Sequence, residues 1–117
     1  MRDKGVKRII KEEKEQEVRQ MQLSRKEIET CIRTLLIKYH AEYAILFGSY
    51  ARGEETEESD IDVIVVGGEH FRAKDIFAFG EELREMTKKD VDAFELREVN
   101  RNSEFYDTVM REGVKIA

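Results

Sequence analysis

The chain has 117 residues, in which 21 Lys and Arg are outnumbered by 26 Asp and Glu, giving a formal net charge of −5. This length predicts one catalytic or binding domain without a second, substrate-holding one, and the net acidity argues against direct DNA binding through a general basic field. No apolar run approaches the roughly 18 residues of a membrane helix, and the N-terminus lacks a signal-peptide core. A single cysteine and two distant histidines supply neither a disulfide nor a zinc site, so we expect a cytoplasmic protein without a membrane segment.

Residues 1–23 are predicted to be a charged extension, helical or disordered. Seven basic and five acidic residues occupy positions 1–22, where apolar residues are sparse. Lys, Glu, Gln and Arg favour helix, but a helix with so few apolar anchors stays solvated. A docking helix for a partner is the alternative interpretation.

Residues 24–117 are predicted to form one α+β domain of alternating helices and strands. Ser24 and Glu27 form a capping-box pattern that begins the first helix, and His40 is expected to close it. Apolar periodicity then predicts strands at 43–47, 61–66 and 91–96, and helices at 71–87 and 103–111. The first two strands are apolar on both faces, which predicts that helices cover both faces of the sheet. The stripe of the second helix is expected to bury Ile76, Phe79, Leu83 and Met86, and the last helix to bury Phe105 and Val109.

Two aspartates at the start of the second strand carry the first chemical signal. Asp60 and Asp62 are two residues apart, so their carboxylates are expected to point to the same face. Two carboxylates held together repel each other unless a cation lies between them. Mg²⁺ takes one or two protein carboxylates together with phosphate oxygens and water, so we expect this cation here.

Gly48 and Ser49 carry the second signal, because they follow a strand and begin a helical turn. The free N–H groups of such a turn bind anions, and glycine lets the backbone approach a phosphate closely. Together with the aspartates, this turn indicates a nucleoside triphosphate bound through Mg²⁺. Ser59 is expected to cap the turn before the second strand.

A third carboxylate would complete a two-metal arrangement that clamps the attacking and leaving oxygens. Asp90 and Asp92 both qualify, and we favour Asp92 because it lies inside the third strand. If Asp92 activates an acceptor hydroxyl, the reaction is in-line transfer onto that hydroxyl with pyrophosphate as the leaving group.

At these positions the chain resembles the minimal nucleotidyltransferases of the DNA polymerase beta-like superfamily. The resemblance rests on GSYARG, the spacer EETEE, SDIDV and then VDAF, and it covers residues 24–117. It implies a nucleotidyltransferase fold, a small mixed β-sheet flanked by helices, with two Mg²⁺ ions and ATP as co-substrate. It assigns Asp60, Asp62 and Asp92 to metal binding and catalysis, and Gly48, Ser49 and Arg52 to nucleotide binding. A surface ion pair is the alternative role for Arg52, and the glutamate-rich spacer is expected to be a solvated loop.

The smallest members of this family also resemble the antitoxin of two-gene modules with a HEPN-type ribonuclease toxin. That resemblance implies transfer of AMP from ATP to a tyrosine hydroxyl of the toxin, which silences it. A catalytic core this bare is expected to need another protein, or a second copy in a homodimer, to complete its acceptor site. Two alternatives stay open: a binding module that neutralises its partner by contact, and nucleotidyl transfer to a small molecule such as an aminoglycoside.

Overall fold

The computed structural model describes residues 23–117, so the predicted N-terminal extension falls almost wholly outside the described part of the chain. The elements in chain order are α2 (Arg25–Lys38), β1 (Tyr43–Phe47), α3 (Ser49–Arg52), β2 (Ile61–Val66), α4 (Ala73–Thr87), β3 (Val91–Glu95), the 3-10 helix η1 (Leu96–Glu98), α5 (Glu104–Glu112) and β4 (Val114–Ile116). None of these helices is both long and apolar enough to cross a lipid bilayer.

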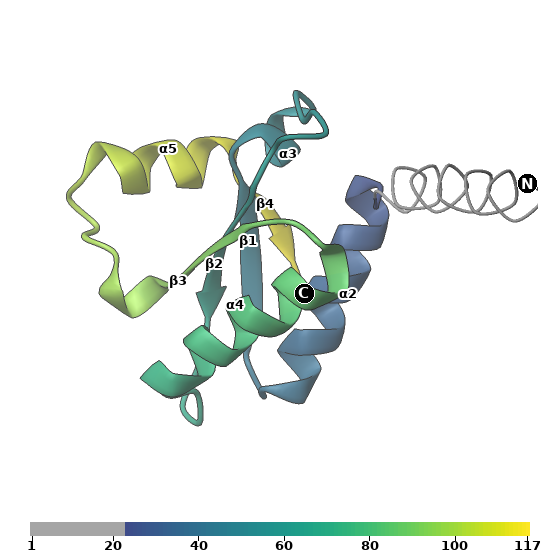
Figure 1. Cartoon of the computed structure of the whole chain (residues 1–117). Helices are drawn as coiled ribbons and strands as arrows, with labels where there is room; N and C mark the ends of the chain where they lie inside the picture. The colour runs from purple at the N-terminus through teal and green to yellow at the C-terminus, as the bar shows by residue number, and fades with distance from the viewer. Residues whose placement is uncertain (1–22) are drawn as a thin grey trace, which may run out of the picture.

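The four strands form one mixed sheet in the order β3-β2-β1-β4 (Figure 1). β1 runs antiparallel to β2 and to β4, whereas β2 and β3 are parallel. The parallel pair requires a crossover connection, and α4 provides it. This arrangement confirms the predicted mixed sheet flanked by helices.

The helices α2 and α4 cover one face of the sheet. Ser24 caps α2 as predicted, with its hydroxyl accepting from the Glu27 N–H at 3.2 Å, and an ion pair between Lys38 and Glu82 links the two helices. The larger core cluster lies between these helices and the sheet, and its buried side chains are Ile28, Ile32, Leu35, Leu36, Ala44, Leu46, Tyr50, Ile61, Val63, Val65, Phe71, Phe79, Leu83, Val91 and Ile116.

The opposite face of the sheet is covered only in part. A small cluster of Ile45, Ile64 and Val109 joins β1 and β2 to α5, which Figure 1 shows on the side away from α4. The prediction of cover on both faces therefore holds for the middle of β1 and β2. It fails toward β3, where Phe94 is 40% exposed. Phe105, which we expected inside, is 41% exposed, because α5 is short and buries only Val109.

Several element ends differ from the sequence-based expectations. α2 ends at Lys38, and His40 follows in a left-handed conformation with φ 55° instead of closing the helix.

α4 begins at Ala73, because the N–H of Arg72 donates to the Asp75 carboxylate at 2.8 Å and forms the cap there. At its other end Met86 is exposed and Thr87 is buried in its place, so the expected inward stripe was wrong at that position. The third strand ends one residue early because Leu96 enters η1.

Candidate active site

Gly48 joins the end of β1 to the turn α3. Its φ of 72° and ψ of −152° lie in a region that side-chain-bearing residues rarely adopt. A Cβ atom built on Gly48 would overlap Oδ2 of Asp62 and lie 3.3 Å from its Cγ. The N–H groups of Ala51 and Arg52 donate to the Gly48 carbonyl at 3.1 and 3.2 Å, which closes the turn. The first N–H groups of a helical turn have no partner inside it, so the geometry of this turn allows the expected anion, whose binding stays a prediction.

Asp62 and Asp92 lie next to each other across the parallel strands β2 and β3. Asp62 is half-buried and Asp92 is exposed. Burial, followed by the negative charges of Asp92 and then Asp60, raises the pKa of Asp62 from its ordinary 3.8 to about 6. Such a pair of carboxylates attracts a positive ion.

Asp60 is placed differently from the pair. It precedes β2, is exposed and acts on Asp62 through its charge. Asp90, the alternative third carboxylate, is also exposed, and its carbonyl accepts from the Ile61 N–H at 2.9 Å to begin the β2–β3 ladder. Within residues 23–117, no three or more His, Cys, Asp or Glu side chains are already gathered as a metal centre. The two facing carboxylates nevertheless fit Mg²⁺, which binds one or two protein carboxylates and takes its other ligands from phosphate and water.

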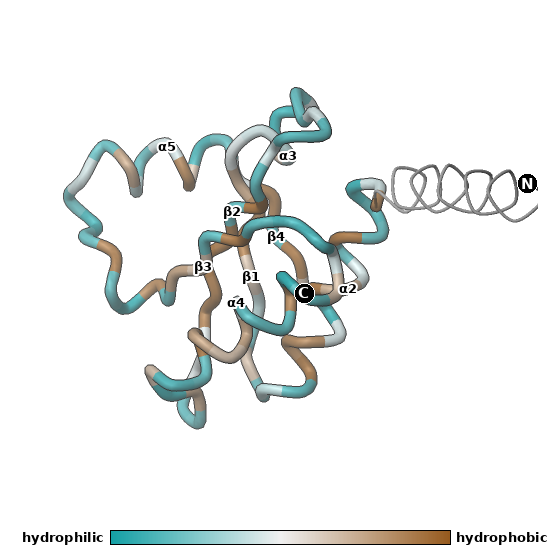
Figure 2. Tube along the Cα trace, in the orientation of Figure 1, coloured by the Kyte–Doolittle hydropathy of each residue, from teal (hydrophilic) through white to brown (hydrophobic). Residues whose placement is uncertain are grey.

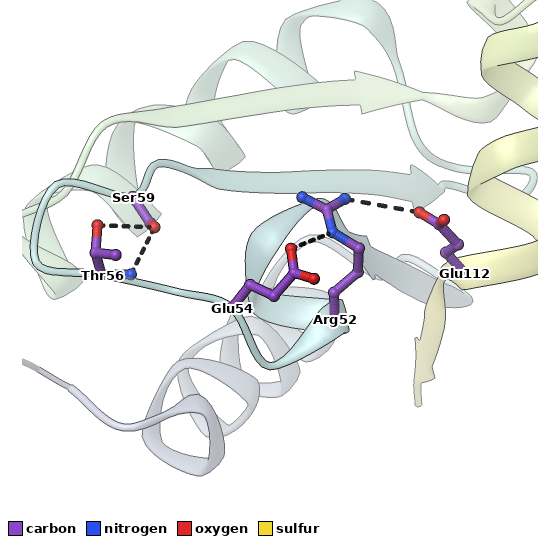
Figure 3. A network of polar contacts seen from close by, with 5 residues as sticks. All are labelled: Arg52, Glu54, Thr56, Ser59 and Glu112. Carbon is purple, nitrogen blue, oxygen red and sulfur yellow. Dashed lines mark hydrogen bonds and ion pairs between the residues drawn. The ribbon is translucent and has the colours of Figure 1, made fainter.

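Arg52 bridges two acidic side chains beside the turn. Its Nε lies 3.0 Å from Glu54 and its Nη1 lies 3.6 Å from Glu112 of α5 (Figure 3). Arg52 thus makes the surface ion pairs of the alternative interpretation, and it also lines the same hollow as Gly48 and Asp62. Its contact with a nucleotide stays a prediction.

The spacer between the two halves of the motif is a polar loop. Its four glutamates, Glu54, Glu55, Glu57 and Glu58, are all exposed, and Figure 2 shows this stretch after α3 as mostly hydrophilic. The Ser59 hydroxyl accepts from the Thr56 N–H at 2.8 Å, which closes the loop just before β2 (Figure 3). Ser59 is therefore a turn-capping residue, as expected.

A hollow of about 410 Å³ lies between the turn and α5. Its lining residues are Phe47, Gly48, Ser49, Arg52, Asp62, Phe105, Thr108, Val109 and Glu112. Phe47 and Phe105 meet edge to face, with ring centroids 5.4 Å apart, and form an aromatic wall. The sequence did not predict this wall, because the helical periodicity placed Phe105 in the core and no motif marks its contact with Phe47.

The described residues thus combine a glycine turn, a carboxylate pair and an adjoining hollow on the strand ends of a small mixed sheet. The family model "Polymerase beta, Nucleotidyltransferase" matches residues 29–117. The chain belongs to this family and is a nucleotidyltransferase, which confirms the resemblance found in the sequence.

Proteins of similar sequence carry a more specific name than the family model does. The chain is 42% identical over 66 residues to "Putative protein adenylyltransferase MJ0435" of Methanocaldococcus jannaschii, across 56% of this chain and 71% of that protein. Four other relatives from this organism carry the same kind of name and align over 28–48% of their own length.

Two solved structures share the fold. One is a toxin–antitoxin crystallised with AMP-PNP, with a TM-score of 0.66 and 25% identity over 76% of this chain and 72% of that chain. The other contains a tri-AMPylated HEPN toxin of Shewanella oneidensis in complex with an MNT antitoxin. It matches with a TM-score of 0.62 and 22% identity over 80% of this chain and 71% of that chain.

Proposed function

We propose that this chain is a Mg²⁺-dependent protein adenylyltransferase that transfers AMP from ATP to a hydroxyl of a HEPN-type toxin in the cytoplasm, and so acts as an antitoxin. The observation that carries the proposal is the adjacency of the Asp62–Asp92 pair to the Gly48 turn, at the edge of a hollow of about 410 Å³. The relatives named as protein adenylyltransferases support the reaction type.

The turn at Gly48 and Ser49 binds the triphosphate in this proposal. Backbone N–H groups of the turn and the Ser49 hydroxyl donate to phosphate oxygens, and Arg52 adds a positive charge from the rim. Glu112 holds Arg52 toward the hollow at 3.6 Å, so α5 helps to position that charge.

The three aspartates have the roles of metal binding and proton acceptance in this proposal. Asp60, Asp62 and Asp92 would hold Mg²⁺, which when bound neutralises charge on the phosphates and polarises the transferred phosphoryl group. Asp92, the exposed member of the pair, accepts the proton of the acceptor hydroxyl. The acceptor oxygen forms a bond to the α-phosphorus while the bond from that phosphorus to pyrophosphate breaks, so AMP is transferred and pyrophosphate leaves.

The aromatic wall of Phe47 and Phe105 offers a stacking surface for the nucleobase. Stacking on an aromatic side chain tolerates every base, so this wall does not select adenine. Support for ATP comes from the AMP-PNP in one structural neighbour and from the AMPylated toxin in the other.

The test is a transfer assay with labelled ATP, Mg²⁺ and the HEPN-type protein encoded by the adjacent gene. Label is expected on that protein, and Asp62→Asn is expected to abolish it. Asp107→Asn is the matched control, because it removes the same charge from an exposed position on α5 that does not line the hollow. Inhibition of the partner that persists without label and without Asp62 would favour a contact-only binding module. Label on small hydroxylated acceptors alone would favour a small-molecule transferase.

A further inference from the structure

β3 is the outer strand of the sheet and has β2 on one side only. The Asp90 carbonyl accepts from the Ile61 N–H, so backbone groups of residues 90 and 92 face β2 and those of 91 and 93 face outward. Arg84 confirms this direction, since its Nη2 donates to the outward Val91 carbonyl at 2.9 Å. Among the described residues, no strand pairs with the outward N–H and C=O of Ala93.

A second hollow, of about 200 Å³, follows this edge between β3 and α4. Ile76, Phe77 and Gly80 line it from the helix, and Asp92, Ala93 and Phe94 line it from the strand. Phe77 is 73% exposed, so the rim of the hollow presents apolar surface to solvent. An exposed strand edge flanked by apolar side chains is a template for pairing with another chain.

The carboxylate pair contributes one side chain to each hollow. Asp62 lines the hollow that begins at Gly48, and Asp92 lines the hollow along the β3 edge. In an in-line displacement the attacking oxygen and the leaving group lie on opposite sides of the phosphorus. If the nucleotide lies on the Asp62 side, the acceptor therefore approaches from the Asp92 side.

We propose that an extended segment of the acceptor protein pairs with the outward edge of β3, packs apolar side chains against Phe77 and Phe94, and presents its hydroxyl to Asp92. This inference rests on the proposed function, in which Asp92 receives the proton of the acceptor. The occupant is an extended loop or terminal segment of the acceptor, because only an extended backbone can bond to a strand edge. Main-chain bonds supply part of the affinity, and the apolar side chains beside the hydroxyl-bearing residue supply the specificity.

The first test is hydrogen–deuterium exchange on the full chain with Asp62→Asn, which blocks turnover, in the presence of the HEPN-type protein of the adjacent gene. The peptide containing Ala93 is expected to exchange at least tenfold more slowly when this protein is added. Protection confined to other surfaces, or no binding, overturns the proposal. Protection that appears without the acceptor at high concentration assigns the edge to a second copy of the chain and also overturns it.

The second test replaces an exposed side chain of the hollow without touching the catalytic pair. Phe77→Ser is expected to raise the KM for the acceptor protein at least tenfold while leaving the affinity for an ATP analogue unchanged. Ile37→Ser is the matched control, because Ile37 is 77% exposed on α2 and does not line the hollow. Equal effects of both variants, or none for Phe77→Ser, contradict the proposal. If the wild type transfers no label but the acceptor still protects the β3 edge, the proposed function fails and the docking surface is upheld.

Discussion

A side chain at Gly48 would collide with the carboxylate of Asp62, because these residues touch where β1 ends and β2 begins. The contact follows from the antiparallel register, in which Phe47 lies opposite Asp62 and Gly48 is the next residue. The turn proposed to bind phosphate and the carboxylate proposed to bind metal are thus held by the same pair of strands. Nucleotide and metal positions are expected to depend on each other.

Gly48→Ala is expected to destabilise the fold and to reduce transfer strongly. The glycine has φ 72° and ψ −152°, which costs a side-chain-bearing residue about 1–3 kcal/mol, and the added methyl displaces Asp62. Urea denaturation should show this loss, and the transfer rate should fall at least 100-fold if the carboxylate moves by about 1 Å.

Gly53→Asn is the control for that variant. Gly53 is also left-handed, with φ 71° and ψ 23°, but a Cβ there meets no atom within 4 Å. Asparagine tolerates this conformation, so we expect nearly unchanged stability and transfer. Equal losses in the two variants would mean that the loss in Gly48→Ala does not come from the contact with Asp62.

Asp62→Asn is expected to stabilise the metal-free protein at neutral pH. The folded state raises the pKa of Asp62 from 3.8 to about 6, so this group favours folding most below pH 3.8 and loses that contribution as the pH rises to 6. The full shift corresponds to about 3 kcal/mol, and screening of the half-buried group reduces this to about 1–2 kcal/mol at pH 7.5. Denaturation curves of the variant and wild type should differ by this amount at pH 7.5 and converge near pH 4. A constant difference across that range would contradict the assignment.

Mg²⁺ is expected to make the wild type more stable than Asp62→Asn. A cation that binds the folded state alone raises its stability by mass action, so Mg²⁺ should raise the melting temperature of the wild type. Asp62→Asn removes a ligand and should abolish the shift, whereas Asp107→Asn should keep it. Removal of the metal by EDTA should return the wild type to its starting value. An equal Mg²⁺ response in all three proteins would exclude a site at Asp62.

Arg52→Gln is expected to raise the KM for ATP about tenfold, the effect of losing one charge-assisted hydrogen bond, without changing the melting temperature. The guanidinium is exposed and its partners Glu54 and Glu112 stay solvated once it is gone. Glu54→Gln is the control, because it breaks one of the same ion pairs at a residue that does not line the hollow. An unchanged KM for ATP in Arg52→Gln would mean that Arg52 forms surface ion pairs and does not bind the nucleotide.

Gly80→Ala is expected to stabilise the protein by about 0.5–1 kcal/mol, since alanine is the better helix former. Gly80 lies inside α4, and a Cβ there would meet the Ala93 Cβ at 3.4 Å, an ordinary contact distance. A shift in the urea midpoint measures the gain. A loss of stability would show that α4 and β3 are packed too closely for a methyl group.

The sequence predicted the elements whose signals are local. The bounds of β1 and β2 are as predicted, since apolar runs ended by glycine or polar residues delimit them. The exposure of Phe105 and Met86 was not predictable, because it depends on how far neighbouring elements extend over each face. No residue pattern states that α5 covers only part of the sheet.

The candidate site was predictable in its residues but not in its geometry. The spacing of Asp60 and Asp62 suggested a matched pair, yet Asp60 precedes β2 and is exposed. The partner that the structure places beside Asp62 is Asp92, thirty residues later along the chain. That pairing depends on the parallel register that the α4 crossover establishes, which is a property of the tertiary fold.

The most direct measurement of the central proposal is the intact mass of the HEPN-type partner after incubation with this chain, ATP and Mg²⁺. The proposal predicts a mass increase by one or more adenylyl groups on a hydroxyl-bearing residue, with release of pyrophosphate. It also predicts no increase with Asp62→Asn and an undiminished increase with Asp107→Asn. An unmodified partner with the wild-type chain, or modification that persists in Asp62→Asn, would contradict it.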